Sequence, residues 1–430
     1  MQNSAEQNLV HEVMRNMGKT VIFSFTSLII LCVSMSQSLL SFASYTSTTT
    51  IVTSGIIKEN AVESIRIRKH VIAYGMWRGF DEQTADLVSS HFDVLDIGWY
   101  SAEISGIERM KEENPDMVIL IYNDVMGRSN ESQGWNEVNS HEDWFVHDKY
   151  GNRLINQHWS WYCMDVGNDG WRNHYVNWVE DKFNKCPGLD GVFADDVWDK
   201  FRYDAWTVPS EDVPEEIGER WHNDQLEFLE YVKQRIGNKL LIINTSNNDD
   251  YVDACDGKMD EDFVHPHWCS YNYWASWTNW TGKIEGVRKV SQKGKYVLVH
   301  SGFKELNEDE AFINSHPEIV REMLMYCFSS YLFAIDGPKA SFGFGGIHNL
   351  DGSRSYYSIF DEAKQLGSPI NDYYSFYSVY ARDFENGKVL VNPTTSFYTV
   401  HLDSEYKTLD GETVSSVTLD GHTGVVLVRM

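Results

Sequence analysis

The amino-acid sequence predicts an α/β fold, a (β/α)8 barrel followed by a small C-terminal antiparallel β-domain. Three observations predict it. From about residue 70, short β-branched runs are separated by longer helical stretches, and there are eight such runs. From Gly387, short runs in which apolar and polar residues alternate follow one another without helices between them. Strands that alternate with helices form parallel βα units, and eight such units close a barrel. A doubly wound open sheet is the structural alternative.

The predicted barrel strands are short and apolar, and helix candidates lie between them. Asp81–Ser90 has an acidic start and Pro214–Ile236 has a proline in its first turn, and both features are typical of helix N-termini. The sixth strand is the least clearly marked, because a connection of only about ten residues precedes it. In chain order the strands are predicted at Val71–Tyr74, Phe92–Ile97, Met117–Tyr122, Leu189–Ala194, Lys239–Ile243, Asp256–Met259, Tyr296–Val299 and Tyr331–Ile335.

Two domains are predicted after the N-terminal region. Residues 67–385 are assigned to the barrel and residues 386–430 to a β-sandwich-like C-terminal domain. In the latter, Asp-Gly dipeptides at 410–411 and 420–421 separate the alternating runs, as hairpin turns do. A segment of about 45 residues has too thin a core to be stable alone. We therefore expect it to pack on the barrel.

The N-terminal region has the pattern of an export signal. Residues 1–43 are predicted to be a signal peptide or a membrane anchor, and residues 44–66 a Ser/Thr-rich linker. The apolar segment Val21–Val33 follows two basic residues, and residues 41–43 supply the small side chains that a signal peptidase prefers. A spanning helix needs about 20 apolar residues, which this segment reaches only by including polar ones. The protein is therefore expected to be secreted or extracytoplasmic, with a membrane tether through the N-terminus as the alternative.

The composition excludes some partners. The chain has 430 residues, and its 36 Lys and Arg against 63 Asp and Glu give a formal net charge of -27. Such a charge repels phosphate backbones, so no nucleic-acid partner is expected.

No cofactor is expected either. A metal site is not expected at His265-Pro266-His267, because a proline separates the two histidines and no third ligand lies near them in the sequence.

Tryptophan is concentrated in the predicted barrel. All 15 Trp residues fall between Trp77 and Trp280. Flat aromatic faces stack on the apolar faces of sugar rings, so the expected partner is an oligo- or polysaccharide.

In a (β/α)8 barrel the active site lies at the carboxyl ends of the strands. The residues there that we assign to substrate binding are Tyr74, Trp77, Trp99, Asn123, Asp124, Asp196, Trp198, Asn244, Asp260, Asp262 and His300.

The strongest motif is the fourth predicted strand, which is followed by Asp195 and Asp196. A buried strand does not end in two carboxylates unless they have partners or a task, and consecutive side chains point to opposite faces. The alternation alone does not decide which of them faces the barrel mouth. Two strands further on, Asp260–Asp262 supply three more acids. Glycoside cleavage needs two facing carboxyl groups, whereas helix capping and loop tying are the alternative roles for both groups.

These stretches carry a family resemblance. DGVFADDVW, followed by INTSN and DGKMDEDFVH, resembles the bacterial and archaeal proteins grouped as hypothetical glycosyl hydrolase family fifteen. The endo-α-1,4-polygalactosaminidases and the α-galactosidase clan are similar at a greater distance. The resemblance implies a barrel with an appended β-domain and retaining cleavage of an α-linkage. It also implies Asp195 as the nucleophile and an acid/base among three adjacent acids, of which we choose Glu261, with Asp260 and Asp262 in reserve.

The leading hypothesis is therefore an exported glycoside hydrolase that cleaves an oligo- or polysaccharide with two carboxylates. Two other functions stay open. In a metal-dependent lyase or isomerase barrel, Asp124, Asp195, Asp196 and Glu261 would bind a divalent cation. A non-catalytic barrel would bind carbohydrate without turnover. Complete loss of activity on chelation would distinguish the metal-dependent enzyme from the hydrolase.

Overall fold

The computed structural model describes residues 67–73, 81–98, 104–201, 213–245, 249–274, 277–345 and 357–430. The chain divides into two units, Met1–Asn60 and Ala61–Met430, and every described residue belongs to the second. The predicted signal or anchor and the predicted linker lie outside the described residues. No described helix has the length and apolarity that spanning a bilayer would require.

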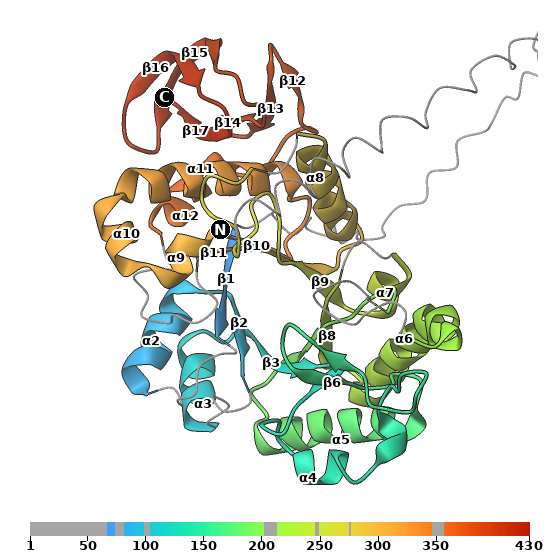
Figure 1. The fold of residues 1–430 in the computed structure, drawn as a ribbon. Coiled ribbons are helices and arrows are strands. Elements are labelled where there is room, and N and C mark those ends of the chain that lie inside the picture. Colours follow the sequence, from blue (N-terminus) through green and yellow to red (C-terminus); the bar gives the residue numbers. More distant parts are fainter. Residues whose placement is uncertain are drawn as a thin grey trace, which may run out of the picture. The chain divides into compact units, whose positions relative to one another are not determined.

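Eight parallel strands close into a barrel, in which neighbours along the chain pair with each other and the last strand pairs with the first (Figure 1). Their order around the barrel is β1-β11-β10-β9-β8-β7-β3-β2. The predicted fold class, a (β/α)8 barrel with a C-terminal β-domain, is confirmed. The barrel strands are β1 Arg68–Ala73, β2 Val94–Ile97, β3 Val118–Asp124, β7 Gly191–Asp195, β8 Leu240–Asn244, β9 Gly257–Asp260, β10 Tyr296–Ser301 and β11 Ala340–Phe344.

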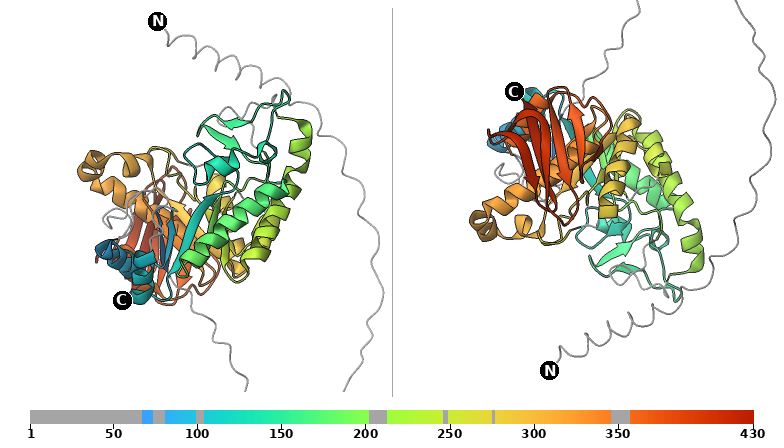
Figure 2. Two further views of the ribbon diagram at one scale, coloured as in Figure 1. Left: turned by 90° about the horizontal axis from the view of Figure 1, so that it is seen from below. Right: turned by 90° about the horizontal axis from the view of Figure 1, so that it is seen from above.

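Helices connect the strands, and Figure 2 shows α5 and α6 side by side on one flank of the barrel. Side-chain caps explain where two of them begin. Asp81 accepts from the backbone N–H of Thr84 at the start of α2, and Asn168 accepts from the backbone N–H of Gly170 at the start of α5. The helices are α2 Glu82–His91, α3 Ile104–Glu113, α4 Trp135–Val138, η3 Glu142–Trp144, α5 Asp169–Lys185, α6 Glu215–Ile236, α7 Asp249–Ala254, α8 Trp277–Gln292, α9 Lys304–Glu308, α10 Glu310–Ser315, α11 Pro317–Ala334, α12 Ile359–Glu362 and η5 Ala363–Leu366.

The predicted eighth strand is wrong. Tyr331–Ile335 belongs to the end of α11 and its cap, and the eighth strand is β11, which begins at Ala340. Every residue from Tyr326 to Ala334 is buried, because α11 lies between the barrel and the C-terminal sheet. A helix that lacks an exposed face shows no 3.6-residue period and cannot be told from a buried strand by its apolar run.

Side chains of the barrel strands alternate between the interior and the helix layer. The strand residues that pack outward belong to the two large apolar clusters beneath the helices. Because alternate residues share a face, a side chain two places beyond an interior residue points into the mouth of the barrel. The apolar residues that fill the interior are Ile72, Val94, Val118, Leu120, Phe193, Ile242, Met259 and Leu298.

The connection between β3 and α5 forms a small sheet of its own, which we call the insertion sheet. Its strands are β4 Gly127–Arg128, β5 Ile155–Asn156 and β6 Trp161–Cys163, and they pair in the order β4-β6-β5. β4 begins only three residues after β3 ends. Because β3 ends at the mouth of the barrel, the insertion sheet begins there too.

A six-stranded antiparallel sheet follows the barrel and packs on α11 (Figure 1), in the order β12-β13-β14-β17-β15-β16. It begins at Tyr374, so its first two strands precede residue 386, where the sequence analysis placed the boundary. The turn between them uses Tyr377, with φ 55°, in place of glycine, so the sequence carries no turn signal there. The strands are β12 Tyr374–Phe376, β13 Val379–Phe384, β14 Gly387–Asn392, β15 Tyr398–Thr408, β16 Thr413–Leu419 and β17 Thr423–Arg429.

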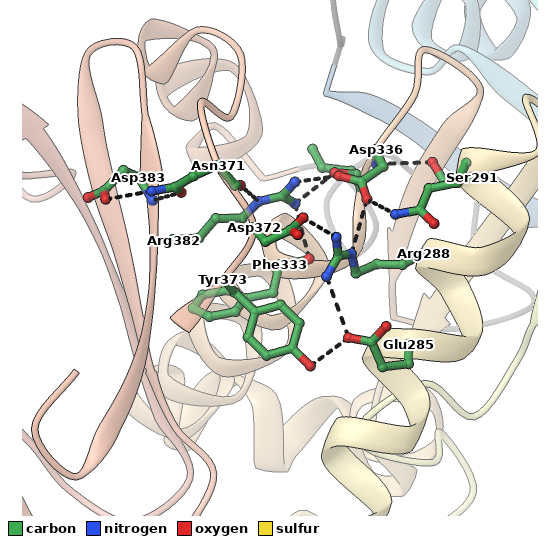
Figure 3. A network of polar contacts seen from close by, with 12 residues as sticks. Glu285, Arg288, Ser291, Phe333, Asp336, Asn371, Asp372, Tyr373, Arg382 and Asp383 are labelled. Atoms are coloured by element: carbon green, nitrogen blue, oxygen red, sulfur yellow. Dashed lines mark hydrogen bonds and ion pairs between the residues drawn. The ribbon is translucent and has the colours of Figure 1, made fainter. Parts of the chain in front are cut away.

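A buried arginine joins this sheet to the barrel. Arg382 of β13 pairs through Nη2 with Asp336, which also accepts from Arg288 of α8 (Figure 3). The last carbonyl groups of a helix have no partner within it, so the guanidinium satisfies them and its charge favours this end of α11. Arg382 Nη1 donates to three such carbonyl groups, those of Leu332, Phe333 and Ile335, at 3.0, 3.0 and 2.7 Å.

Candidate active site

Three adjacent strands place polar side chains together at the mouth of the barrel. In each of β7, β8 and β9, a polar residue lies two places after the last interior apolar residue. The three polar residues, in the order of the strands, are Asp195, Asn244 and Glu261. The strands pair in parallel, β7 with β8 and β8 with β9, so the three side chains lie next to one another. Asp195, and not Asp196, therefore continues the interior face of its strand.

Asn244 holds the two predicted catalytic acids together. Its Nδ2 donates to Asp195 Oδ1 at 2.9 Å and to Glu261 Oε2 at 2.8 Å. Two hydrogen bonds through one nitrogen keep the two oxygens within about 6 Å of each other. The structure thus brings Asp195 and Glu261 together from different strands.

Donors fix the orientation of Asp195. Tyr122 donates its hydroxyl to Asp195 Oδ2 at 2.7 Å, and the backbone N–H of Asp196 donates to Oδ1 at 2.9 Å. Together with Asn244 these donors engage both carboxylate oxygens. Three donors on two oxygens hold the carboxyl group in one position.

Glu261 has the surroundings of a proton donor. Burial of its carboxyl group, followed by the nearby charge of Asp195, raises the pKa of Glu261 to about 8. His267 lies at its other side, with Nε2 3.9 Å from Glu261 Oε1. A carboxyl group with this pKa keeps its proton at neutral pH and can give it to a leaving oxygen.

Two further predicted acids adjoin Asp195. Asp124 is its direct partner in the register between β3 and β7, and burial raises the pKa of Asp124 to about 7. Asp196 has φ 56°, a conformation that is costly for a residue with a Cβ. Burial and the neighbouring carboxyl groups raise the pKa of Asp196 well above its usual value. Trp198 Nε1 donates to Asp196 Oδ1 at 3.2 Å, so Asp124, Asp196 and Trp198 all lie beside the acid pair.

Two interior side chains of the site, Tyr122 and Asp96, were not predicted from the sequence. Asp96 is 1% exposed, and neither of its carboxylate oxygens has a hydrogen-bond partner among the described residues. Burial and the charge of Asp195 raise the pKa of Asp96 well above its usual value, so this side chain is neutral. An acid between two apolar residues of a strand, Leu95 and Ile97, is the signal that could have identified it.

Two residues predicted to bind substrate point into the helix layer instead. Asn123 lies on the outer face of β3, where it accepts from Arg128 Nη2 at 2.9 Å. Asp260 pairs with Lys283 of α8 at 2.8 Å. Consecutive residues of a strand face opposite sides, so Asp260 points outward where Met259 points inward. We correct both assignments: Asn123 and Asp260 stabilise the outer layer of the barrel.

His300 and Asp262 differ in accessibility. His300 faces the interior but is 2% exposed, and its Nδ1 lies 3.4 Å from His70 Nε2. Burial and the neighbouring histidines lower the pKa of His300 well below its usual value, so it is neutral and enclosed. Asp262 follows Glu261 in the loop after β9 and accepts from Nε1 of the exposed Trp268 at 3.0 Å. Of the two, Asp262 is the one at the accessible rim.

Some predicted residues stay untested. Tyr74, Trp77 and Trp99 lie outside the described residues. Within the part of the chain that the structure describes, no group of three or more His, Cys, Asp and Glu side chains could hold a metal ion. The acids at the mouth are held instead by an asparagine, a tyrosine and backbone N–H groups.

Glycoside hydrolases place two carboxyl groups at the scissile bond, and the acid pair of this barrel has that arrangement. Sequence comparison then gives the family. The chain belongs to the proteins described as hypothetical glycosyl hydrolase family 15, whose model matches residues 111–388. This range contains both acids and ends inside the C-terminal sheet. The resemblance carried by DGVFADDVW is confirmed, and the protein is a glycoside hydrolase.

Several solved structures have a similar fold at low sequence identity. An α-amylase from Anoxybacillus is 13% identical, with 85% of this chain and 97% of that chain covered and a TM-score of 0.47. The glycoside hydrolase domain of PelA from Pseudomonas aeruginosa is 13% identical, with 64% and 94% covered and a TM-score of 0.43. A MUTB mutant soaked with trehalulose is 10% identical, with 85% and 99% covered and a TM-score of 0.51. No curated protein sequence matches the chain.

Proposed function

We propose that the protein is an exported hydrolase of an oligo- or polysaccharide, in which Asp195 is the nucleophile and Glu261 the acid/base of a retaining mechanism. The observation that carries this proposal is the Asn244 side chain, which donates to both carboxyl groups at once. Glycoside cleavage with retention requires two carboxyl groups that lie close together.

The separation of the two acids supports retention. Their bridged oxygens lie within about 6 Å, whereas inverting pairs are about 6.5–9.5 Å apart to leave room for a water molecule. In the first step an Asp195 oxygen bonds to the anomeric carbon while the glycosidic bond breaks and Glu261 protonates the leaving oxygen. In the second step Glu261 takes a proton from water, whose oxygen attacks the same carbon and releases Asp195.

The charge of the chain narrows the substrate. The chain as a whole has a net charge of -27. Anionic sugars such as uronic acids would be repelled. We therefore propose a neutral or amino sugar, joined by the α-linkage that the family resemblance implies.

A substrate screen tests this proposal. Aryl α- and β-glycosides and purified neutral, cationic and anionic polysaccharides are incubated with wild type, Asp195→Asn and a surface control, Asp181→Asn on α5. We expect hydrolysis of a neutral or cationic α-glycan, loss of about a thousandfold or more in Asp195→Asn, and no change in the control. NMR of the first anomer released should show retained configuration.

Other results would favour the alternatives. Equal hydrolysis by Asp195→Asn and wild type would remove Asp195 from the mechanism. Reversible loss of activity with EDTA would favour a metal-dependent enzyme, and sugar binding without turnover would favour a binding protein. An inverted product would require a water-activating base in place of a nucleophile.

Export is proposed from the N-terminal sequence alone. The uncharged apolar segment Val21–Val33 with small residues at 41 and 43 supports a signal peptide or an anchor. Cell fractionation of the full chain, with N-terminal sequencing of the mature protein, tests it. We expect the protein outside the cytoplasm, either cut near residue 43 or retained in the membrane fraction.

A further inference from the structure

We infer that Trp159 and Trp161 of the insertion sheet form a stacking platform for a sugar unit of the substrate chain, beyond the units that flank the cleaved bond. The inference rests on the proposed function and names a subsite for it. Trp161 lies on β6, and Trp159 lies in the turn between β5 and β6. Neither residue takes part in the acid pair.

The two indoles form a stack that ends in solvent. Their ring centroids are 5.6 Å apart with an interplanar angle of 22°. Trp159 is 56% exposed, and Trp161 is half-buried beneath it. A side chain as large and apolar as Trp gains little by standing in water, so this placement needs a reason other than core packing.

The turn that carries Trp159 is fixed by local contacts. The buried side chain of Asn156 accepts from the backbone N–H groups of His158 and Trp159 at 3.0 and 3.1 Å. Ser160 has φ 59°, a left-handed conformation that a residue with a Cβ adopts only at a cost. The turn is therefore held in one shape, which presents a preformed aromatic surface.

A glycine connects this stack to the catalytic acids. A Cβ at Gly127 would lie 2.5 Å from Trp161 Cε3 and 2.7 Å from Asp124 Oδ2. Any residue other than glycine at position 127 would force these side chains to move, because real Cβ atoms do not approach other atoms so closely. Trp161 Cε3 and Asp124 Oδ2 therefore lie within about 5 Å of each other beside Gly127, and Asp124 is the register partner of Asp195.

The side chains between the stack and the acid pair are of the kinds that bind sugars. Trp161 shares the lining of a small hollow with Asp196 and Trp198, so aromatic faces and carboxyl oxygens meet there. Sugar rings combine apolar faces with hydroxyl groups, and they are recognised by stacking together with a few placed hydrogen-bond acceptors. Because Trp161 lies near Asp124 and Asp196, beside the acid pair, a substrate chain is the occupant that would reach both the stack and the pair.

The kinetics of Trp159→Ala on oligosaccharides of increasing length test the platform. The matched control is Tyr150→Ala, which removes another exposed aromatic residue, 72% exposed, from a different turn of the same insertion. We expect Trp159→Ala to lower kcat/KM about tenfold on the longest substrate, mainly through KM, and progressively less on shorter ones. Trp159→Phe should restore part of the loss, and Tyr150→Ala should match wild type.

Two outcomes overturn the inference: no loss in Trp159→Ala at any length, or an equal loss at every length. Binding separates failure of the platform from failure of the proposed function. Affinity electrophoresis of Asp195→Asn in polysaccharide gels, with and without Trp159→Ala, needs no turnover. Retardation that disappears with Trp159→Ala supports the platform even where wild type hydrolyses nothing, and unchanged retardation overturns it.

Discussion

Asp195 and Glu261 carry the same functional group and differ in what surrounds it. Asp195 receives hydrogen bonds from Tyr122, Asn244 and the backbone, which together hold its carboxyl group in place. Glu261 receives one from Asn244 and is dominated by burial and by the charge of Asp195. Two carboxyl groups with divided environments are the usual means by which one site supplies both an acid and a base.

The pH dependence of kcat/KM should report the proton of Glu261. Because its pKa is raised to about 8, the group is protonated below that pH and loses its proton above it. Hydrolysis of an unactivated glycan should therefore fall about tenfold per pH unit on the alkaline side of pH 8. The Glu261→Gln variant, assayed with a dinitrophenyl glycoside that needs no proton donor, should lack this limb. A limb that persists in Glu261→Gln would belong to another acid, for which Asp124 is the first candidate.

The sequence located the acids of the site but not their directions. A motif of two acids after an apolar run gave Asp195, and a family resemblance gave its role, because both depend on chain position alone. Whether Asp195 or Asp196 faces the interior depends on which face of the strand is the inner one. The structure shows this through Phe193, which lies in the barrel interior, but the sequence does not. Asp96 was missed because no motif contains it.

The alternation of side chains along a strand also explains why Asp260 and Glu261 have different roles. Asp260, the last residue of β9, points toward α8, whereas Glu261 points into the mouth of the barrel, although the two acids are adjacent in the sequence. Lys283 is the partner that α8 supplies for Asp260. This pair ties the helix to the barrel and takes no part in the chemistry.

Lys283→Met should destabilise the protein without changing kcat. Removing the lysine leaves Asp260, whose side chain is only 4% exposed, without its nearest cation, at a cost of about 3 kcal/mol in the free energy of unfolding. Lys289→Met on the same helix is the matched control, because its partner Asp249 is exposed and such pairs contribute below about 1 kcal/mol. Urea denaturation measures the difference. Equal stabilities of the two variants would contradict the assigned role of Asp260.

Strands were predictable where a short apolar run has polar ends. Seven of the eight predicted strands overlap barrel strands, because β-branched runs bounded by polar ends have few other interpretations. The eighth failed because α11 is covered on one side by the barrel and on the other by the C-terminal sheet. An element enclosed by two layers loses the polar positions from which its period is read.

At the scale of the whole molecule, chemistry and domain packing are separated along the barrel axis. The acid pair lies at the carboxyl ends of the strands. Arg382 and Asp336 meet in the connection from α11 to β11, which lies at the amino ends. The sequence could not place this junction, because the misassigned eighth strand put Asp336 at the mouth. Loss of the junction should therefore affect stability and leave the site intact.

Arg382→Met tests that separation. It leaves three carbonyl groups at the C-terminal end of α11 and its cap without this donor, and Asp336 without one of its two arginines, so the free energy of unfolding should fall by about 3 kcal/mol or more. Arg321→Met is the control, because Arg321 also links α11 to the C-terminal sheet, through the exposed Asp410. Arg382→Lys should fall between wild type and Arg382→Met, since lysine keeps the charge but cannot reach several acceptors at once. At a temperature where all variants are folded, kcat should be unchanged, and a loss of kcat in Arg382→Lys would show that the junction and the acid pair are coupled.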